Sequence, residues 1–224
     1  MRFRSNRYFM LVASLPAMPP RLESARLPIG PARLEERLRL LEPEDAREMA
    51  RMTDVLEWSR QFREATDAAV AERYDELMRA VSNPLVREVL TDLMDVRMLT
   101  TALRRRRRGL GPPEVGIGRW FDHIRRNYAR PDFRLGRLFP RLSRLAPLLE
   151  QGDVLSLHRA LMTIAWQRFK RRADDHTFGF EAVVLYVVRW HLIAQWQAMR
   201  AEQGRPIFES LVAEALGENA HVDV

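Results

Sequence analysis

The chain has 224 residues, of which 46% are hydrophobic and 30% charged, and its formal net charge is +7. This balance excludes an intrinsically disordered chain, and the length allows a buried core in one large domain or two small ones. Glycine is scarce, at 10 residues, whereas residues that favour helices, above all Leu, Ala, Arg, Glu and Met, are abundant. Cysteine does not occur, which excludes disulfides and thiolate chemistry and favours a reducing compartment.

The basic side chains are nearly all arginine, since Lys170 is the single lysine among 37 basic residues. A skew across the whole chain is more typical of a GC-rich coding sequence than of selected guanidinium chemistry, so a single arginine does not indicate a site. The net charge nevertheless favours anionic partners, which include nucleic acid, acidic lipid headgroups and acidic protein surfaces.

The N-terminal region places arginines before an apolar run at 8–13, the general pattern of a signal peptide. The run is only about six residues long, at or below the lower limit for such a peptide, and Pro16 follows soon after it. The longest apolar block, 182–188, is far shorter than the ~20 residues of a membrane-spanning helix. We therefore expect neither a cleaved signal nor a membrane span.

The first elements are read from proline positions and apolar spacing. Residues 8–15 predict a short strand or the first turn of a helix, and the proline-rich segment 16–31 predicts an extended linker. A helix is expected over 32–41, and Pro43 suits the first turn of the next helix. Apolar residues at three- and four-residue spacing then predict a long amphipathic stretch over 44–80.

Residues 84–107 carry the clearest helical pattern, with an apolar face that repeats every three or four residues. Five arginines close the pattern and Gly109 follows, which predicts a cationic last turn and a C-terminal glycine cap. A Gly- and Pro-rich break covers 109–118, and a short helix is expected over 120–128.

The remaining chain predicts short turns over 131–147, a helix over 152–172 and a nearly all-round apolar helix over 178–202 that ends at Gly204. A terminal helix is expected over 206–216. Six or more helices with short connections indicate an all-α helical bundle.

The predicted organisation has three parts. An N-terminal segment and linker covers 1–31, and a first helical subdomain covers 32–109. A second helical subdomain covers 118–224 and packs on the first as one compact unit.

Motifs that carry chemistry are missing from the sequence. The glycines between 109 and 118 lack the pattern of a phosphate-binding P-loop. The five histidines never occur at HExxH or HxxxH spacing, and no serine stands in a GxSxG turn. We therefore expect no catalytic residue, no cofactor, no metal ligand and no small-molecule substrate.

Two places remain as candidate interaction surfaces. The arginine run at 104–108 could bind the phosphates of nucleic acid, an acidic protein or a membrane surface. Because successive helix positions point around the axis, some of these arginines would instead only face solvent and others would lie over core residues. Near the far end of the last long helix, an Arg–Trp surface would suit a protein interface, while a core position for the tryptophan fits the spacing equally well. The candidate residues are Arg104, Arg105, Arg106, Arg107, Arg108, Arg189, Trp196 and Arg200.

Three segments resemble one known family, in the same order along the chain. The first, Tyr8 to Pro16, resembles the N-terminal signature of a compact bacterial branch found with V-type ATPase operons. The second, Leu93 to Arg104 and on to Gly109, resembles a family helix in which an acidic residue precedes an Asn-Leu pair and an aliphatic–basic stretch. The third resembles the C-terminal half of that branch and of its larger archaeal relatives, through Asp132, Phe133, Leu135, Trp166, Phe178, Phe180, Tyr186, Trp196, Gly204 and Phe208.

On these segments the chain resembles the C-subunit family of V/A-type ATPases. The sequence departs from the family pattern at Met98, where Asn is common, and at Thr100, where larger members carry a basic residue. It is also shorter than the three-lobed archaeal members, so one lobe would be missing or reduced.

The resemblance implies a non-catalytic central-stalk component of a bacterial V/A-type ATPase, which links the membrane rotor ring to the central shaft by protein–protein contacts. It also implies a cytoplasmic location, peripheral to the inner face of the cell membrane, with membrane contact only through partners. The composition leaves one alternative, an arginine-rich helical protein that binds nucleic acid and whose binding weakens steeply with salt.

Overall fold

The computed structural model describes residues 7–61, 67–139, 151 and 154–219, with side chains for 7–56, 68–139, 151 and 156–201. These residues form eight helices and no strand, which confirms the expected all-α fold. None of the helices in these ranges is long and apolar enough to cross a membrane. The helices are α1 (Phe9–Ser14), α2 (Pro31–Leu38), α3 (Pro43–Gln61), α4 (Asp67–Ala80), α5 (Pro84–Arg107), α6 (Phe121–Arg126), α8 (Val154–Ala173) and α9 (Phe180–Asn219).

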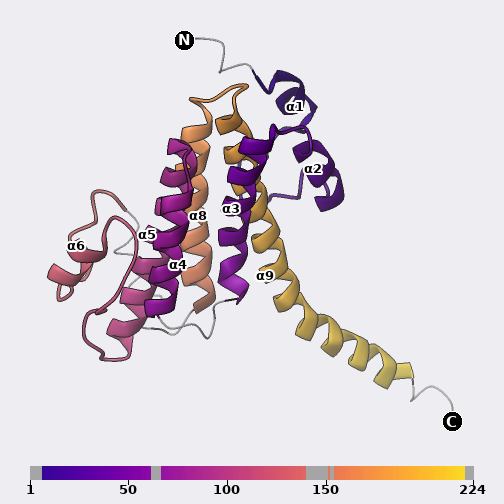
Figure 1. The fold of residues 1–224 in the computed structure, drawn as a ribbon. Helices are drawn as coiled ribbons and strands as arrows, with labels where there is room; N and C mark the ends of the chain where they lie inside the picture. Colours follow the sequence, from indigo (N-terminus) through magenta and orange to yellow (C-terminus); the bar gives the residue numbers. More distant parts are fainter. Residues whose placement is uncertain (1–6, 62–66, 140–150, 152–153, 220–224) are drawn as a thin grey trace.

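The bundle consists of α3, α4, α5, α8 and the first part of α9, which run alongside one another (Figure 1). Helices α1 and α2 lie against one end of this bundle, and α6 lies at its side. The second part of α9 continues beyond the bundle and leaves it as a single extended helix. Helix α1 and the C-terminal end of α9 therefore lie at opposite ends of the described structure.

The N-terminal segment forms a helix rather than a strand. Its first anchor is Tyr8, whose backbone N–H donates to the carbonyl oxygen of Phe178 at 2.9 Å. The Tyr8 hydroxyl donates to Asp45 at 2.5 Å and accepts from the backbone N–H of Glu42 at 3.1 Å. The linker after α1 contains no helix, as expected, but it buries Leu22 completely.

Helix α5 has the bounds that the sequence predicts because both of its ends carry local signals. The Asn83 side chain caps the N-terminus by accepting from the N–H groups of Leu85 and Val86, at 2.9 and 3.1 Å. At the other end Gly109 adopts a φ of +67° and donates to the carbonyl of residue 106, while the N–H of residue 110 reaches the carbonyl of residue 105. This pair of hydrogen bonds is a Schellman motif, which requires the left-handed backbone that glycine adopts at little cost.

The C-terminal helix contradicts one prediction. A single helix, α9, covers Phe180–Asn219, so Gly204 does not end it and no separate helix starts at Pro206. Gly and Pro in a helix interior cost about 1 and about 3 kcal/mol, and Pro206 removes one backbone hydrogen bond. These costs weaken a helix locally without forcing it to stop when good helix-forming sequence continues on both sides.

Three clusters of buried side chains hold the helices together. The main cluster joins α1, α3, α4, α5, α8 and α9, and thus contains residues from both predicted helical subdomains, whose division stays a prediction. A second cluster joins the C-terminal half of α5 to α6, to the turn over 133–139 and to α8. A small third cluster seats the linker on α9, where the indole N–H of Trp190 donates to the carbonyl of Ile29 at 2.8 Å.

Candidate functional site

In the arginine run at the end of α5, three side chains are exposed to solvent and two are partly buried against the chain. Arg105 and Arg106 are partly buried, and Nε of Arg105 donates to the carbonyl oxygen of Gly111 at 3.0 Å. This bond fastens the loop that follows the helix. The exposed members of the run are Arg104, Arg107 and Arg108.

Arg106 joins the end of α5 to the turn that follows α6. Its guanidinium donates to the carbonyl oxygens of Tyr128, Arg130 and Pro131, the last two at 2.7 and 2.9 Å. It also lies 4.1 Å from the ring centroid of Phe133, a cation–π distance. Burial lowers the pKa of this guanidinium from its ordinary value. The geometry assigns Arg106 a structural part, since both of its terminal nitrogens donate to backbone carbonyls within the chain.

The other predicted surface, on α9, is not an exposed Arg–Trp patch. Trp196 is 6% exposed and belongs to the main core, which is the alternative that the sequence left open. Nε of Arg189 donates to the carbonyl of Leu185 at 3.1 Å, and its side chain is partly buried, which lowers its pKa. Of the three predicted residues only Arg200 is exposed. The fold therefore does not bring Arg189, Trp196 and Arg200 together on one accessible face.

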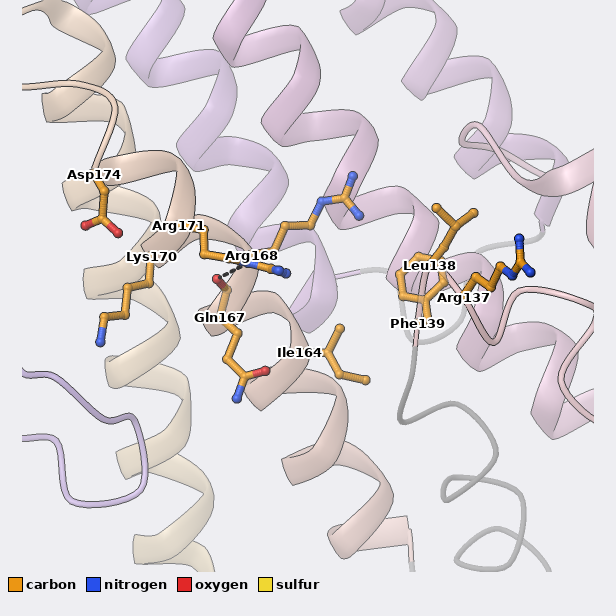
Figure 2. A pocket seen from close by; sticks show the side chains of 9 residues that line it. All are labelled: Arg137, Leu138, Phe139, Ile164, Gln167, Arg168, Lys170, Arg171 and Asp174. Carbon is orange, nitrogen blue, oxygen red and sulfur yellow. Dashed lines mark hydrogen bonds between the residues drawn. The ribbon is translucent and has the colours of Figure 1, made fainter.

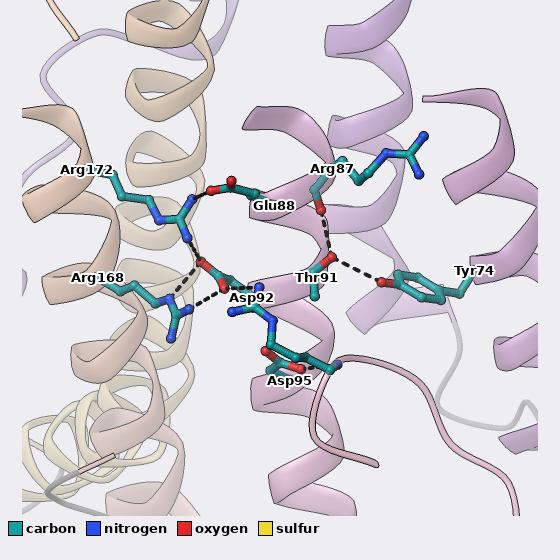
Figure 3. A network of polar contacts seen from close by, with 9 residues as sticks. Tyr74, Arg87, Glu88, Thr91, Asp92, Asp95, Arg168 and Arg172 are labelled. Carbon is teal, nitrogen blue, oxygen red and sulfur yellow. Dashed lines mark hydrogen bonds and ion pairs between the residues drawn. The ribbon is translucent and has the colours of Figure 1, made fainter. Parts of the chain in front are cut away.

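A network of ion pairs around a buried carboxylate crosses from α5 to α8 (Figure 3). At its centre the Asp92 side chain, 1% exposed, faces three guanidinium groups. Arg168 contacts it at two points, 2.7 Å each, and Arg172 lies 3.1 Å away. Arg119, from the loop before α6, lies 3.7 Å away. Arg172 also pairs with Glu88, one turn before Asp92 on α5.

A second buried carboxylate, Asp95, holds the loop before α6. Its Oδ1 accepts from the backbone N–H of Arg119 at 2.6 Å, while its Oδ2 is buried without a hydrogen-bond partner among the described residues. Burial raises the pKa of Asp95 to about 6, an effect that the Arg119 backbone hydrogen bond and guanidinium oppose. The carboxylate also packs against Gly118, which has a φ of +90°.

These contacts fix the relative position of three elements. A buried charge is stable only with partners of good geometry, so the ion pairs specify how α5, α8 and the loop before α6 meet. The central carboxylate, Asp92, is surrounded by three guanidinium groups. Nowhere in the described ranges do three or more His, Cys, Asp or Glu side chains gather as metal ligands would.

A cleft of about 480 Å³ lies beside the network, between α8 and the turn after α6 (Figure 2). Its basic side chains are mostly engaged elsewhere: Arg168 contacts Asp92, Lys170 donates to the carbonyl of Pro20 at 3.2 Å, and Arg171 Nε donates to that of Gln167 at 3.3 Å. The described residues on its walls include no Ser, Thr, Cys or His side chain. The lining residues are Arg137, Leu138, Phe139, Ile164, Gln167, Arg168, Lys170, Arg171 and Asp174.

Comparison with protein families identifies one match, which covers residues 52–218, well over half of the chain. It is the family described as "Protein of unknown function (DUF2764)". The chain belongs to the DUF2764 family. The matched range contains α4, α5, α6 and α8 and hence the whole buried network. No curated protein and no solved structure matches the chain.

The sequence analysis did not single out the network of this DUF2764 chain, although a signal existed. Asp92 and Asp95 stand three residues apart on α5, among the buried apolar positions of that helix, and the exposed Glu88 lies one turn before Asp92. Carboxylates inside an apolar stripe require cationic partners. Such partners stand four residues apart on α8, but only the fold shows that the two helices meet.

Proposed function

We propose that this DUF2764 protein is a non-catalytic coupling component of a V/A-type rotary ATPase, similar to the C-subunit family, which joins the membrane rotor ring to the central shaft. The observation that carries the proposal is the order of three segments that resemble that family. An all-helical bundle without a membrane-spanning helix in its described part is compatible with such a role. In this proposal the protein lies at the cytoplasmic face of the membrane and works through protein–protein contacts.

The three segments also lie in contact within the fold, which supports reading them as parts of one unit. The first meets the third where the Tyr8 N–H bonds to the Phe178 carbonyl and the ring of Phe9 lies 4.6 Å from that of Phe178. The second meets the third in the cluster where Leu99 and Leu103 pack with Phe133. Residues that resemble a family at scattered positions thus build a shared core.

The buried ion pairs suit a part that transmits force. Torque passes through a coupling protein only if its helices do not slide past one another under load. Apolar contacts are non-directional, whereas ion pairs of fixed geometry define one register between helices. The pairs between α5 and α8 therefore support a mechanical role for the bundle.

The test is affinity purification of the tagged full-length chain from native membranes in mild detergent. The proposal expects rotary ATPase components of the ring and the shaft to co-purify, and it expects the isolated protein to hydrolyse no ATP. A tagged cytosolic protein of similar size and charge serves as the control for non-specific capture. If the tagged chain recovers no more of any ATPase component than this control does, the proposal is wrong.

A further inference from the structure

The positive charge of the chain is concentrated in one segment. Residues 104–137 contain 11 arginines and three acidic residues, a net charge of +8. The rest of the chain keeps 26 of the 37 basic and 27 of the 30 acidic residues, a net charge of −1. The whole excess of +7 thus comes from this segment, which we call the arginine lobe (residues 104–137).

The arginine lobe is continuous in space as well as in sequence. Arg106 binds backbone carbonyls of residues 128, 130 and 131, and the Tyr128 hydroxyl lies 3.0 Å from the carbonyl of Leu110. Ile124 and Phe133 are fully buried in the same cluster beneath the lobe. With α6 at its centre, the lobe lies at one side of the bundle (Figure 1).

Nine of the 11 arginines are exposed. Within the described part of the chain, Arg119 alone among these nine lies at ion-pair distance from a carboxylate, the buried Asp92. For the other eight, no described carboxylate lies at ion-pair distance, and such a concentration of like charge favours an anionic partner. The exposed arginines are Arg104, Arg107, Arg108, Arg119, Arg125, Arg126, Arg130, Arg134 and Arg137.

Large aliphatic side chains are exposed on the same part of the molecule. Leu110 and Val115 lie within the lobe, 46% and 42% exposed, and Leu138 follows it directly, 52% exposed. Such side chains gain nothing from a phosphate backbone in water, but they gain free energy where they enter the acyl boundary of a bilayer.

The aromatic side chains of the lobe, unlike these aliphatic ones, pack against the buried cluster beneath it. Phe133 is fully buried, Trp120 and Phe121 pack against the cluster beneath the lobe, and the Tyr128 hydroxyl is bonded to backbone. Proteins that bind single strands stack bases on accessible aromatic rings, and duplex readers insert a helix or ribbon into a groove. The described lobe contains one complete helix, α6, of six residues and only the last turn of α5, and its aromatic rings pack against the cluster beneath it, so it favours neither mode.

We propose that the arginine lobe binds the anionic headgroups of a lipid bilayer directly, with Leu110, Val115 and Leu138 entering the interface between its headgroups. Guanidinium groups suit phosphate esters because they donate two parallel hydrogen bonds. The family resemblance implies membrane contact only through partners, so this surface adds a direct contact. It does not depend on the proposed function, since the argument uses charge and exposure alone.

The test is co-sedimentation of the full-length protein with vesicles at several salt concentrations. Vesicles of equal parts phosphatidylcholine and phosphatidylglycerol should bind the protein, vesicles of pure phosphatidylcholine should not, and binding should weaken as salt rises. Arg125→Ala with Arg126→Ala should lower the partition coefficient about 30-fold, the factor expected for two basic residues near an anionic surface. Leu138→Ser should lower it about threefold or more without changing the charge.

The matched control is Arg33→Ala with Arg47→Ala, which removes the same charge from exposed positions on α2 and α3. It should bind vesicles like the wild type, and circular dichroism should show all variants to be equally helical. Equal losses in both double variants, or no binding to anionic vesicles, would overturn the proposal. Tighter binding to a DNA duplex or RNA strand than to vesicles, unaffected by Leu138→Ser, would assign the lobe to nucleic acid instead.

The two proposals fail separately. Vesicle binding by the isolated chain without recovery of ATPase components from membranes would leave the lipid surface standing and remove the coupling function. If the chain recovers ATPase components but does not bind anionic vesicles, the coupling function stands and the lipid surface is overturned.

Discussion

The guanidinium of Arg168 on α8 and the carboxylate of Asp92 on α5 meet at two points, with Nε 2.7 Å from Oδ2 and Nη2 2.7 Å from Oδ1. Asp92 is 1% exposed and Arg168 is 26% exposed at the side chain, so water reaches the pair only from the arginine end. In such a place the loss of one partner leaves a charge that the interior does not solvate. The register of the two helices therefore depends on this pair.

We predict that Asp92→Asn destabilises the fold by about 3 kcal/mol, because it leaves Arg168 and Arg172 without their shared counter-charge. Urea unfolding followed by circular dichroism measures the effect. Glu35→Gln is the control, since its pair with Arg39 is about three-quarters exposed on both sides and should change stability by less than about 0.5 kcal/mol. Similar losses in the two variants would show that the buried network has no special weight.

Asp95 lies one turn after Asp92 on α5, and we predict that Asp95→Asn stabilises the fold, whereas Asp92→Asn destabilises it. Burial raises the pKa of Asp95 to about 6, above the value of about 3.9 in an unfolded chain. Between pH 4 and 6 the folded state therefore holds a proton that the unfolded state has lost, and the contribution of Asp95 to stability falls as pH rises through this window. Above pH 6 the ionised carboxylate is a constant penalty.

The Asn side chain cannot ionise, and its carbonyl oxygen still accepts from the Arg119 N–H. We expect Asp95→Asn to match the wild type near pH 4 and to exceed its stability by about 2 kcal/mol at pH 7. Unfolding free energies at intervals from pH 4 to 8 test this, and the difference between the two proteins isolates Asp95 from the other acids. A variant that is less stable than the wild type at pH 7 would contradict it.

The sequence predicted elements whose ends carry local signals. Helix α5 begins after Asn83 and ends before Gly109 because a side-chain cap and a left-handed residue act within one turn of the chain. The predicted end of α9 was wrong because local signals do not always stop a helix. Gly204 and Pro206 usually end helices, but they cost only a few kcal/mol, and α9 continues through them.

The candidate site was harder to predict because its partners are distant in sequence. Asp92 and Arg168 are 76 residues apart, and nothing local identifies which of many arginines meets the buried carboxylate. Within the arginine run, Arg106 turns inward to bind backbone carbonyls, while Arg104, Arg107 and Arg108 stay exposed. A run in sequence does not predict a patch when successive helix positions point in different directions.

Arg106→Leu should loosen the attachment of α6, since three backbone carbonyls lose their donors. We expect a loss of about 2 kcal/mol in unfolding free energy, with faster amide exchange over residues 121–133. Arg107→Leu removes the same charge from an exposed neighbour and should stay within about 0.5 kcal/mol of the wild type. Arg106→Lys should rescue only part of the loss, because one ammonium group cannot reach all three carbonyls with the geometry of a guanidinium.

Substitutions of glycine separate backbone strain from crowding around the Asp95 loop. Gly118 has a φ of +90°, and a Cβ there would lie 2.6 Å from Oδ1 of Asp95 and 3.2 Å from its backbone nitrogen. Gly118→Ala should therefore cost about 2 kcal/mol or more, through strain and displacement of the carboxylate. Gly109 shares the left-handed backbone, at φ +67°, but faces open space, so Gly109→Ala should cost only about 1 kcal/mol.

Gly111 completes the series, because a Cβ there meets nothing within 4 Å and its backbone is not left-handed. Gly111→Ala should be neutral or slightly stabilising, since it lowers the entropy of the unfolded chain while the carbonyl that binds Arg105 is kept. Thermal unfolding of the three variants under identical conditions gives the order directly. We expect Gly111→Ala to be the most stable variant, Gly109→Ala the next and Gly118→Ala the least stable. Equal losses of stability in Gly109→Ala and Gly118→Ala would show that crowding against Asp95 adds nothing to the backbone strain.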